Sequence, residues 1–427
     1  MRGEISPVVR RLALVAVVVL ACILPVCRTA AQAQVSDADK RCLGCHSRPG
    51  LFKRLESSDH MSMVVPADVF AKSAHAANAC TDCHTDVNAN THLQTRKSIK
   101  STRDYSIVQV QVCQKCHEKE SGAWQHSIHA ALVDAGNADG PVCTSCHAAH
   151  AEIKGAPDLL ETVPCKSCHD TIFAAYAGSV HAQPSADGKT APLPCSACHN
   201  AHDVSVASSP TGPKNACIAC HDGVLQTHQA WLPDAALHFE VVSCPACHVP
   251  AAPRRVDLQL VDSGARTRLA EKAGVPTFQT PGPSVDAIAL YNLLRQSDKR
   301  HAALRGRLEV GTAEQIHQLA PKSQAIHDCH TCHSPDADAF RSVTVSVAGP
   351  DGLPIRYATD QDVLRSVMSI GSIGGFYAIG ATRIGLLDVL LILAVLVGIG
   401  VPAAHLLLGA IVKRHLRARD AARRRPE

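Results

Sequence analysis

The sequence predicts a mainly α-helical fold with much irregular structure, and three observations support this prediction. The 427 residues include 20 cysteines and 25 histidines but only 7 Phe, 5 Tyr and 2 Trp, so something other than aromatic side chains must fill the interior. Short Cys-x-x-Cys-His segments recur along the chain, and joints rich in Pro, Gly, Asn and Ala separate them. A long apolar stretch near the C-terminus predicts one transmembrane helix.

Residues 1–33 have the pattern of an export signal. Arg2, Arg10 and Arg11 precede the apolar run "LALVAVVVLACIL", and small residues ending in "AAQA" follow it. This order is typical of a signal peptide that is cleaved after Ala33. The alternative is a lipoprotein, because "VLAC", which ends at Cys22, loosely resembles a lipidation site.

Cys-x-x-Cys-His occurs nine times and uses all the cysteines that remain after such a cleavage. The nine motifs are Cys42/Cys45/His46, Cys80/Cys83/His84, Cys113/Cys116/His117, Cys143/Cys146/His147, Cys165/Cys168/His169, Cys195/Cys198/His199, Cys217/Cys220/His221, Cys244/Cys247/His248 and Cys329/Cys332/His333.

This motif is the attachment signature of haem c. Its two thiols add to the haem vinyl groups, and the adjacent imidazole binds the iron as the proximal ligand. A disulfide framework would suit an exported Cys-rich chain, and zinc ribbons also use Cys-x-x-Cys pairs. Neither requires a histidine after every second cysteine, so the sequence predicts nine covalently bound haems c.

The motifs form a repeat. Cys113, Cys143, His129 and His150 recur 52 residues later as Cys165, Cys195, His181 and His202. Self-similarity at a fixed offset indicates a repeated structural unit, here a two-haem module. A looser copy runs from Cys42 to His84 and contains His75, and another runs from Cys217 to His248 and contains His238. Residues 34–248 are therefore predicted to form an eight-haem region of four two-haem modules packed on haem.

The chain after the eighth motif has a different character. Residues 249–328 are predicted to form a helical insert, because the apolar positions of 286–309 have helical spacing. Residues 329–383 hold the ninth motif, a small β-hairpin near 342–359 with a Pro-Asp-Gly turn, and a membrane-proximal segment.

Residues 384–412 are predicted to be the transmembrane helix, and residues 413–427 a basic cytoplasmic tail with seven Lys and Arg against two acids. We expect a single C-terminal span in the bacterial inner membrane, with the haem domain in the periplasm. Without the signal and the tail, 31 bases stand against 35 acids, so nucleic acid is not an expected partner.

Each haem iron has a second axial position. The exported part has 14 histidines outside the motifs, enough for nine distal ligands. His129, His181, His150 and His202 are the leading candidates because they recur at the 52-residue offset, and His75 and His238 follow by position. Ligation by histidine on both faces closes the iron and favours electron transfer over substrate binding. For other histidines, such as His92 or His301, an exposed side chain is as plausible as ligation.

The "S-x-H-A … C-x-x-C-H-x-x-H" modules of residues 42–333 resemble the multihaem cytochromes c of the superfamily that holds hydroxylamine oxidoreductase, octahaem tetrathionate reductase and cytochrome c nitrite reductase. The Cys-x-x-Cys-Lys motif typical of the catalytic haem in nitrite reductases is not present. The anchor is also C-terminal, whereas the short quinol-oxidising cytochromes of the nitrate and nitrite systems are anchored at the N-terminus. A C-terminally anchored cytochrome of this kind is similar to subunits that work beside a membrane cytochrome b.

We therefore expect an electron-transfer protein or redox-complex subunit rather than a stand-alone enzyme, and we assign no catalytic residue. It would carry electrons between the quinone pool, or a cytochrome b or other quinol-oxidising subunit, and periplasmic redox partners. The alternative is a multihaem oxidoreductase of small nitrogen or sulfur compounds with one open iron. His405, an ionisable residue within the predicted span, suggests packing against another membrane protein.

Overall fold

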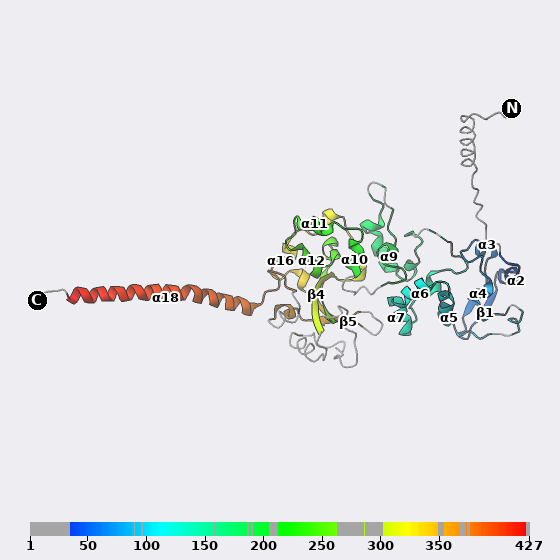
Figure 1. The fold of residues 1–427 in the computed structure, drawn as a ribbon, viewed down its shortest axis with the longest axis horizontal. Coiled ribbons are helices and arrows are strands. Elements are labelled where there is room, and N and C mark those ends of the chain that lie inside the picture. Colours follow the sequence, from blue (N-terminus) through cyan, green and yellow to red (C-terminus); the bar gives the residue numbers. More distant parts are fainter. Residues whose placement is uncertain are drawn as a thin grey trace, which may run out of the picture. The chain divides into compact units, whose positions relative to one another are not determined.

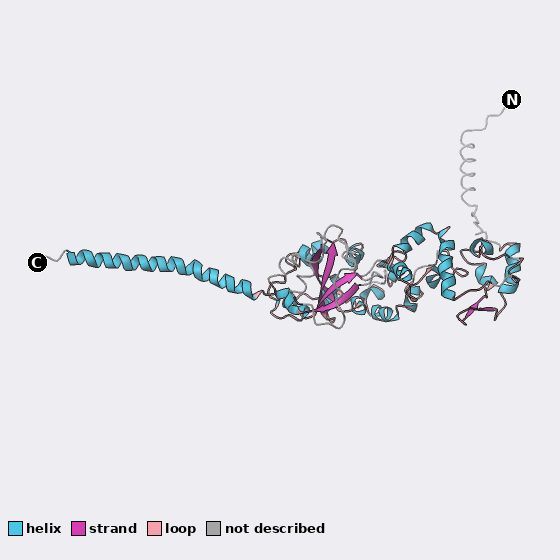
Figure 2. Cartoon of the chain, turned by 90° about the horizontal axis from the view of Figure 1, so that it is seen from below, coloured by secondary structure: helices cyan, strands magenta, loops and turns pink. Residues whose placement is uncertain are grey.

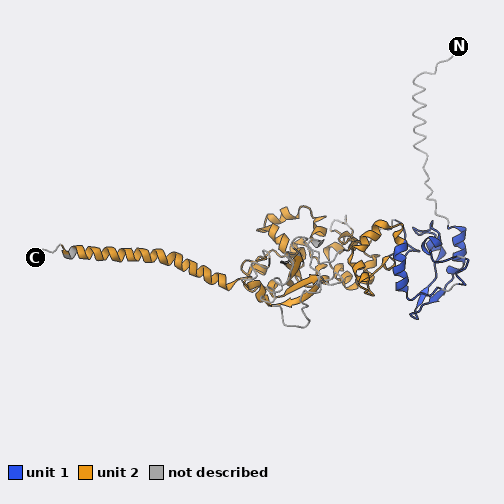
Figure 3. Cartoon of the chain, turned by 60° about the horizontal axis from the view of Figure 1, so that its bottom comes forward, with its two compact units in different colours: residues 1–112, 147–156 blue, residues 113–146, 157–427 orange. Residues whose placement is uncertain are grey.

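The computed structural model describes residues 35–88, 90–94, 97–154, 156, 159–185, 188, 191–204, 212–262, 286, 302–348, 354–366, 373 and 376–423. The predicted signal peptide lies outside these residues. The chain divides into two compact units (Figure 3). The first unit is Met1–Val112 with His147–Ala156, and the second is Cys113–Cys146 with Pro157–Glu427.

The first unit is made of short elements. Its helices are α2 (Asp37–His46), α3 (Ala67–Phe70), α4 (Cys80–Cys83) and most of α5 (Thr102–Gln114), and its strands β1 (Phe52–Arg54) and β2 (His60–Ser62) form an antiparallel hairpin. Ser36 starts α2, because its side chain accepts a hydrogen bond from the Asp39 backbone N–H over 3.1 Å.

The second unit begins with equally short helices (Figure 1). They are α6 (Glu118–Gln125), α7 (Ile128–Asp134), α8 (Cys143–Cys146), α9 (Asp170–Ala177), α10 (Gly212–Ile218), α11 (Val224–Gln229), α12 (Ala235–Val241), α13 (Cys244–His248), α15 (Ala313–Ile316) and α16 (His330–His333). Short 3-10 helices lie between these helices or follow them: η1 (Pro164–Ser167), η2 (Val180–Ala182), η3 (Cys195–Ala197), η4 (Lys322–Gln324), η5 (Asp338–Phe340) and η6 (Gln361–Arg365).

A four-stranded sheet in the second unit has the order β4-β3-β5-β6 (Figure 2). Its strands are β3 (Arg254–Asp262), β4 (Ala302–Val310), β5 (Val343–Ala348) and β6 (Pro354–Thr359). The β3–β4 and β5–β6 pairs are antiparallel, and β3–β5 is parallel. The predicted hairpin near 342–359 is thus present as β5–β6, and its Pro-Asp-Gly turn lies outside the described residues.

The main hydrophobic core lies on one face of this sheet. Val256, Leu258 and Leu260 alternate along β3 and are at most 1% exposed, and they pack with Leu304 and Val345 of the neighbouring strands. Alternating residues point to opposite faces of a strand, so the residues between them form the other face. There the Asp257 carboxylate accepts hydrogen bonds from Ser346 Oγ at 3.0 Å and Thr344 Oγ1 at 3.2 Å.

The prediction of a helical insert is wrong for residues 302–309, which lie in strand β4. Leu304 and Leu308 are four residues apart, and this spacing puts two side chains on one face of a helix and equally on one face of a strand. Pairing with β3 decides for the strand. The N-terminal part of the insert is strand β3, and residues 287–301, where the helical spacing was also read, lie outside the described residues.

Helix α18 (Gly385–Arg423) follows the second unit's sheet and contains Pro402 without ending there. Within the described residues it is the one helix that is long and apolar enough to cross a membrane. Its start agrees with the predicted start of the span at Ile384.

Candidate haem-binding sites

Each Cys-x-x-Cys-His motif begins on a helical turn. In six motifs the backbone N–H of the histidine donates to the carbonyl oxygen of the first cysteine over 2.8–3.0 Å, as at His84, His117, His169, His199, His221 and His333. Residues three and four positions apart on such a turn share one side. Both thiols and the imidazole can therefore reach a single planar group, which is the arrangement that haem c requires.

The second cysteine of most motifs is exposed, as at Cys116. Cys113 is half-buried on α5, but the helix ends at Gln114, so Cys116 lies on the turn beyond it and its side chain is exposed. The Cys116 backbone N–H donates to the Cys113 carbonyl oxygen over 3.2 Å, which keeps both residues on one turn. The structure does not confirm attachment at Cys116, and its role stays a prediction that rests on the motif. The other exposed second cysteines are Cys45, Cys83, Cys146, Cys168, Cys198 and Cys220.

Within the described residues, seven motif histidines face a second histidine. The ring centroids are separated by 6.4 Å in His46–His92, 5.9 Å in His84–His150, 6.4 Å in His129–His169, 6.2 Å in His181–His221, 6.0 Å in His199–His317, 6.3 Å in His228–His248 and 6.0 Å in His238–His333.

These separations fit a metal ion between two imidazoles. Bonds from an imidazole nitrogen to a metal are about 2 Å long, so two bonds in line plus half a ring on either side give about 6 Å between centroids. Incidental van der Waals contacts between histidines would not give the same separation between ring centroids in all seven pairs. The residues present therefore fit a haem iron with histidine on both faces.

The other ring nitrogen of these histidines is held by the protein. Nδ1 of His46 lies 2.9 Å from the Met63 carbonyl oxygen, and Nδ1 of His333 lies 2.8 Å from that of Ile379. His228 and His317 contact the carbonyl oxygen four residues earlier on their own helices, at 2.8 and 2.7 Å. A hydrogen bond at Nδ1 orients the ring and leaves Nε2 as the ligand atom.

Two motif histidines have different Nδ1 partners. His84 contacts the Tyr105 hydroxyl at 2.9 Å. His147 faces a carboxylate, because its Nδ1 lies 3.3 Å from Glu152 Oε2. A carboxylate partner raises the basicity of a ligating imidazole more than a carbonyl partner does.

Burial keeps several of these imidazoles neutral. It is the main cause that lowers the pKa of His84, His129, His150, His181, His199 and His248, and a neighbouring histidine lowers each pKa further. A neutral imidazole is the form that binds a metal, so the protein prepares these side chains for ligation.

The first cysteines of paired motifs lie side by side. A hydrogen bond from Cys113 lowers the pKa of the Cys143 thiol to about 7, and one from Cys217 lowers that of Cys244 to about 6. In the first module Asp39 connects the motifs, since its carboxylate accepts from the Cys80 backbone N–H at 2.8 Å and lies near Cys42. Because both thiols belong to haem motifs, we interpret Asp39 as a structural link rather than a separate metal ligand.

Four of the predicted distal histidines face a motif imidazole: His129, His150, His181 and His238. His75 contacts the Ala149 carbonyl oxygen through Nδ1 at 3.0 Å, and the His202 backbone N–H donates to Asn200 Oδ1 at 3.3 Å.

Three further histidines in these pairs were not singled out from the sequence: His92, His228 and His317. None of them recurs at the 52-residue offset, and nothing in their sequence surroundings distinguishes them from His126, which also bonds to a carbonyl four residues earlier. His301 lies outside the described residues.

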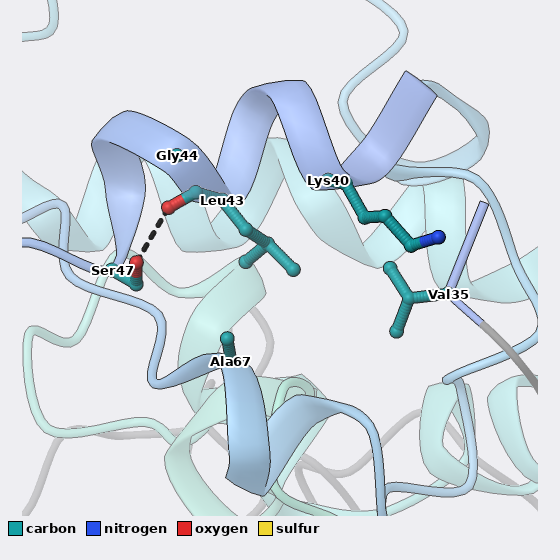
Figure 4. A pocket seen from close by; sticks show the side chains of 6 residues that line it. All are labelled: Val35, Lys40, Leu43, Gly44, Ser47 and Ala67. Carbon is teal, nitrogen blue, oxygen red and sulfur yellow. Dashed lines mark hydrogen bonds between the residues drawn. The ribbon is translucent and has the colours of Figure 1, made fainter. Parts of the chain in front are cut away.

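A hollow of about 330 Å³ lies beside α2 (Figure 4). Lys40, Leu43 and Gly44 line it from the helix, Ser47 lines it from the C-cap, and Val35 and Ala67 complete it. Leu43 and Gly44 follow Lys40 by three and four positions, so these residues share one face of α2, opposite the face that carries Cys42, Cys45 and His46. The hollow is therefore not part of the first haem-binding site.

Among curated proteins and solved structures, nothing matches the chain. Residues 164–249 match the family model described as cytochrome c554 and c-prime. This range holds the third and fourth predicted modules, with four of the nine motifs. The match, together with the spacing of the cysteines, implies covalently bound haem c and supports an electron-transfer role for the chain as a multihaem c-type cytochrome.

Proposed function

We propose that the protein is a membrane-anchored, periplasmic, nine-haem cytochrome c that carries electrons between the quinone pool and periplasmic redox acceptors, directly or through a membrane cytochrome b. The observation that carries this proposal is the set of seven histidine pairs at 5.9–6.4 Å. Haem c supplies reversible one-electron transfer, and closure of both iron faces by histidine leaves no position for a substrate.

The pairs follow a rule along the repeat. The first candidate histidine of a module serves the first motif after that module, as His129 faces His169, His181 faces His221 and His238 faces His333. His75 holds the same position in the first module, so it is a distal-ligand candidate on the same ground.

The second candidate histidine follows the opposite rule. His150 comes three residues after the second motif of its module and faces His84, the second motif of the preceding module. His202 holds the same position one repeat later, so it too is a distal-ligand candidate. The seven paired histidines with His75 and His202 make nine candidates, as many as there are motifs.

Consecutive motifs are also neighbours in the second unit. Burial raises the pKa of the Cys146, Cys198 and Cys247 thiols. Cysteines of the next motif raise each pKa further: Cys165 and Cys168 act on Cys146, Cys220 acts on Cys198, and Cys332 acts on Cys247. Groups bound to neighbouring motifs are held close together by the polypeptide. Within the second unit, haems on consecutive motifs would therefore be close enough to exchange electrons.

The test is electron paramagnetic resonance of the oxidised, fully loaded protein at low temperature, together with its reduction in native membranes supplied with quinol. We expect nine low-spin ferric signals and reduction of the haems by quinol. A high-spin ferric signal equal to one haem would contradict closure of all nine irons and favour an oxidoreductase of small nitrogen or sulfur compounds.

A further inference from the structure

The backbone that leads into α18 lies directly against the ninth motif. His333 Nδ1 is 2.8 Å from the Ile379 carbonyl oxygen. The next residue, Gly380, has φ +88°, and a Cβ atom there would lie 2.5 Å from the His333 carbonyl oxygen. Only glycine fits both the backbone conformation and the close approach. The proximal ligand and residues 379–380 are therefore held as one piece.

The same segment is fixed to the core of the second unit. Ile373 forms a bridge with Leu304 of β4, and Phe376 packs so closely on Gly306 that a Cβ atom there would lie 2.5 Å from its ring. Ala381 and Ile384 are each 5% exposed, so they belong to the protein interior. The segment therefore leaves the core at a defined place and is not a loose tether.

Chain length limits how far the ninth site can lie from α18. Gly385, where the helix begins, is five positions after Gly380. An extended chain covers at most about 3.6 Å per residue, so this connection spans about 18 Å at most. If α18 crosses the bilayer, the ninth haem-binding site lies near the membrane surface.

Exposed side chains of this segment suit such a position. Tyr377 is 53% exposed and Ile379 is 73% exposed, although their neighbours Ala381 and Ile384 are buried. Tyrosine is enriched where membrane proteins pass from the bilayer to water. The Arg383 guanidinium pairs with the Asp388 carboxylate at 3.1 Å, which offsets the one acid in the first turn of α18. We call Tyr377, Ile379 and Arg383 the membrane-facing rim.

We propose that the rim rests on the bilayer surface and that the ninth haem-binding site, formed by His238 and His333, is the port where electrons pass between the membrane and the protein. This inference rests on the proposed function. The electron source is a quinol, which gives up two electrons and two protons. The electrons reduce two ferric haems, one electron each, and the protons are released to water on the outer side.

The test uses the full-length, fully loaded protein in nanodiscs of phosphatidylethanolamine and phosphatidylglycerol, with menadiol as the quinol. The first variant is Ile379→Asp, which leaves the backbone carbonyl that contacts His333 in place. Its matched control is Val108→Asp on α5, a side chain that is 57% exposed. We expect Ile379→Asp to slow menadiol-dependent reduction at least tenfold, Val108→Asp to reduce at the wild-type rate, and dithionite to reduce every variant equally.

A second variant, His238→Met, changes the port itself. Methionine in place of histidine raises the reduction potential of a haem. We expect the midpoint potential of one haem to rise and reduction of the remaining haems by menadiol to slow. Electron transfer from the port to the next haem is then thermodynamically unfavourable. His126→Met on α6 is the control and is expected to change neither quantity.

Hydrogen–deuterium exchange gives a readout that does not depend on electron transfer. We expect the amides of residues 376–384 to exchange more slowly in nanodiscs than in detergent, and Ile379→Asp to reduce this protection. Equal exchange in both media would overturn the contact between the rim and the bilayer.

The outcomes separate the port from the proposed function. Suppose that quinol reduces the wild type, and that it also reduces the haems of Ile379→Asp and the remaining haems of His238→Met at the wild-type rate. The port is then wrong and the proposed function stands. If quinol reduces the wild type only in native membranes, the variants are compared in those membranes, and the direct electron donor is a quinol-oxidising membrane protein. If quinol reduces the wild type in neither setting, the proposed function itself fails.

Discussion

The Nδ1 atom of His147 lies 3.3 Å from Glu152 Oε2, so a carboxylate stands behind the proximal ligand of the fourth motif. At the first and ninth motifs the corresponding partner is a backbone carbonyl oxygen. A carboxylate gives the ligating imidazole more negative character and favours ferric over ferrous iron. We therefore expect Glu152 to lower the reduction potential of a haem bound at this motif.

We expect Glu152→Gln to raise the midpoint potential of one haem and to leave the other eight unchanged. The negative charge that favours ferric iron is lost, and the hydrogen bond at Nδ1 becomes weaker. Spectroelectrochemical titration of the loaded protein measures this shift. Glu152→Asp should keep the midpoint potential closer to the wild-type value than Glu152→Gln does. Glu161→Gln, at an exposed position, is the matched control. A titration curve identical to the wild type would remove Glu152 from this role.

Removal of one distal ligand should open one iron. We expect His181→Ala to convert one haem from low-spin to high-spin and to allow it to bind carbon monoxide, because His181 faces the motif histidine His221 at 6.2 Å. His126→Ala is the control, since His126 is exposed and is not one of the nine candidate distal ligands. An unchanged absorption spectrum with carbon monoxide would exclude His181 as a ligand.

The repeat rule makes the same prediction for His75 and His202. Either substitution by alanine should produce one high-spin haem, and the double variant should produce two. Electron paramagnetic resonance counts these signals directly. If both single variants kept nine low-spin haems, neither His75 nor His202 would be a distal ligand.

The intact mass of the purified protein tests the number of haems. We expect nine covalent haems on a chain cleaved after Ala33, because nine motifs use every cysteine beyond the signal. Acid and organic solvent remove haem that is not covalently bound but leave haem c attached through thioether bonds. A mass that corresponds to fewer than eight haems would contradict the assignment.

His405 tests whether α18 is more than an anchor. An ionisable residue inside a membrane span is costly unless it meets a polar partner. We expect His405→Leu to leave the haem spectra unchanged while it weakens association with a membrane partner or slows quinol-linked reduction. Leu406→Ala, beside it on the helix, is the control. If the complex survives detergent extraction and reduction keeps its wild-type rate, the helix is only an anchor.

The sequence alone predicts the candidate distal histidines that recur in the repeat. His129, His181 and His150 were found because each has a counterpart 52 residues away, and a shared offset implies a shared role. His317 has no counterpart and lies 118 residues after the motif histidine that it faces, His199. Local sequence carries no information about such a distant pairing, which depends on how the sheet returns the chain to the sixth motif.

The sheet itself was only half predicted. The β5–β6 hairpin has the alternation and the turn residues that identify a hairpin. Strand β3 also alternates, as in Val256, Asp257, Leu258 and Gln259, but its partners are residues far away in the sequence. For β4, Leu304 and Leu308 fit either a helix or a strand, and Gly306 between them is unfavourable in both, so only the pairing with β3 decides for the strand.

The exchange of ligands between modules has a consequence for how such proteins change. His84 faces His150 of the following module, and His221 faces His181 of the preceding one. If these pairs bind haem iron, deletion of a single module would leave an iron elsewhere in the chain with an empty sixth position. A reactive centre can arise in this architecture by shortening the gene, without the invention of any new residue.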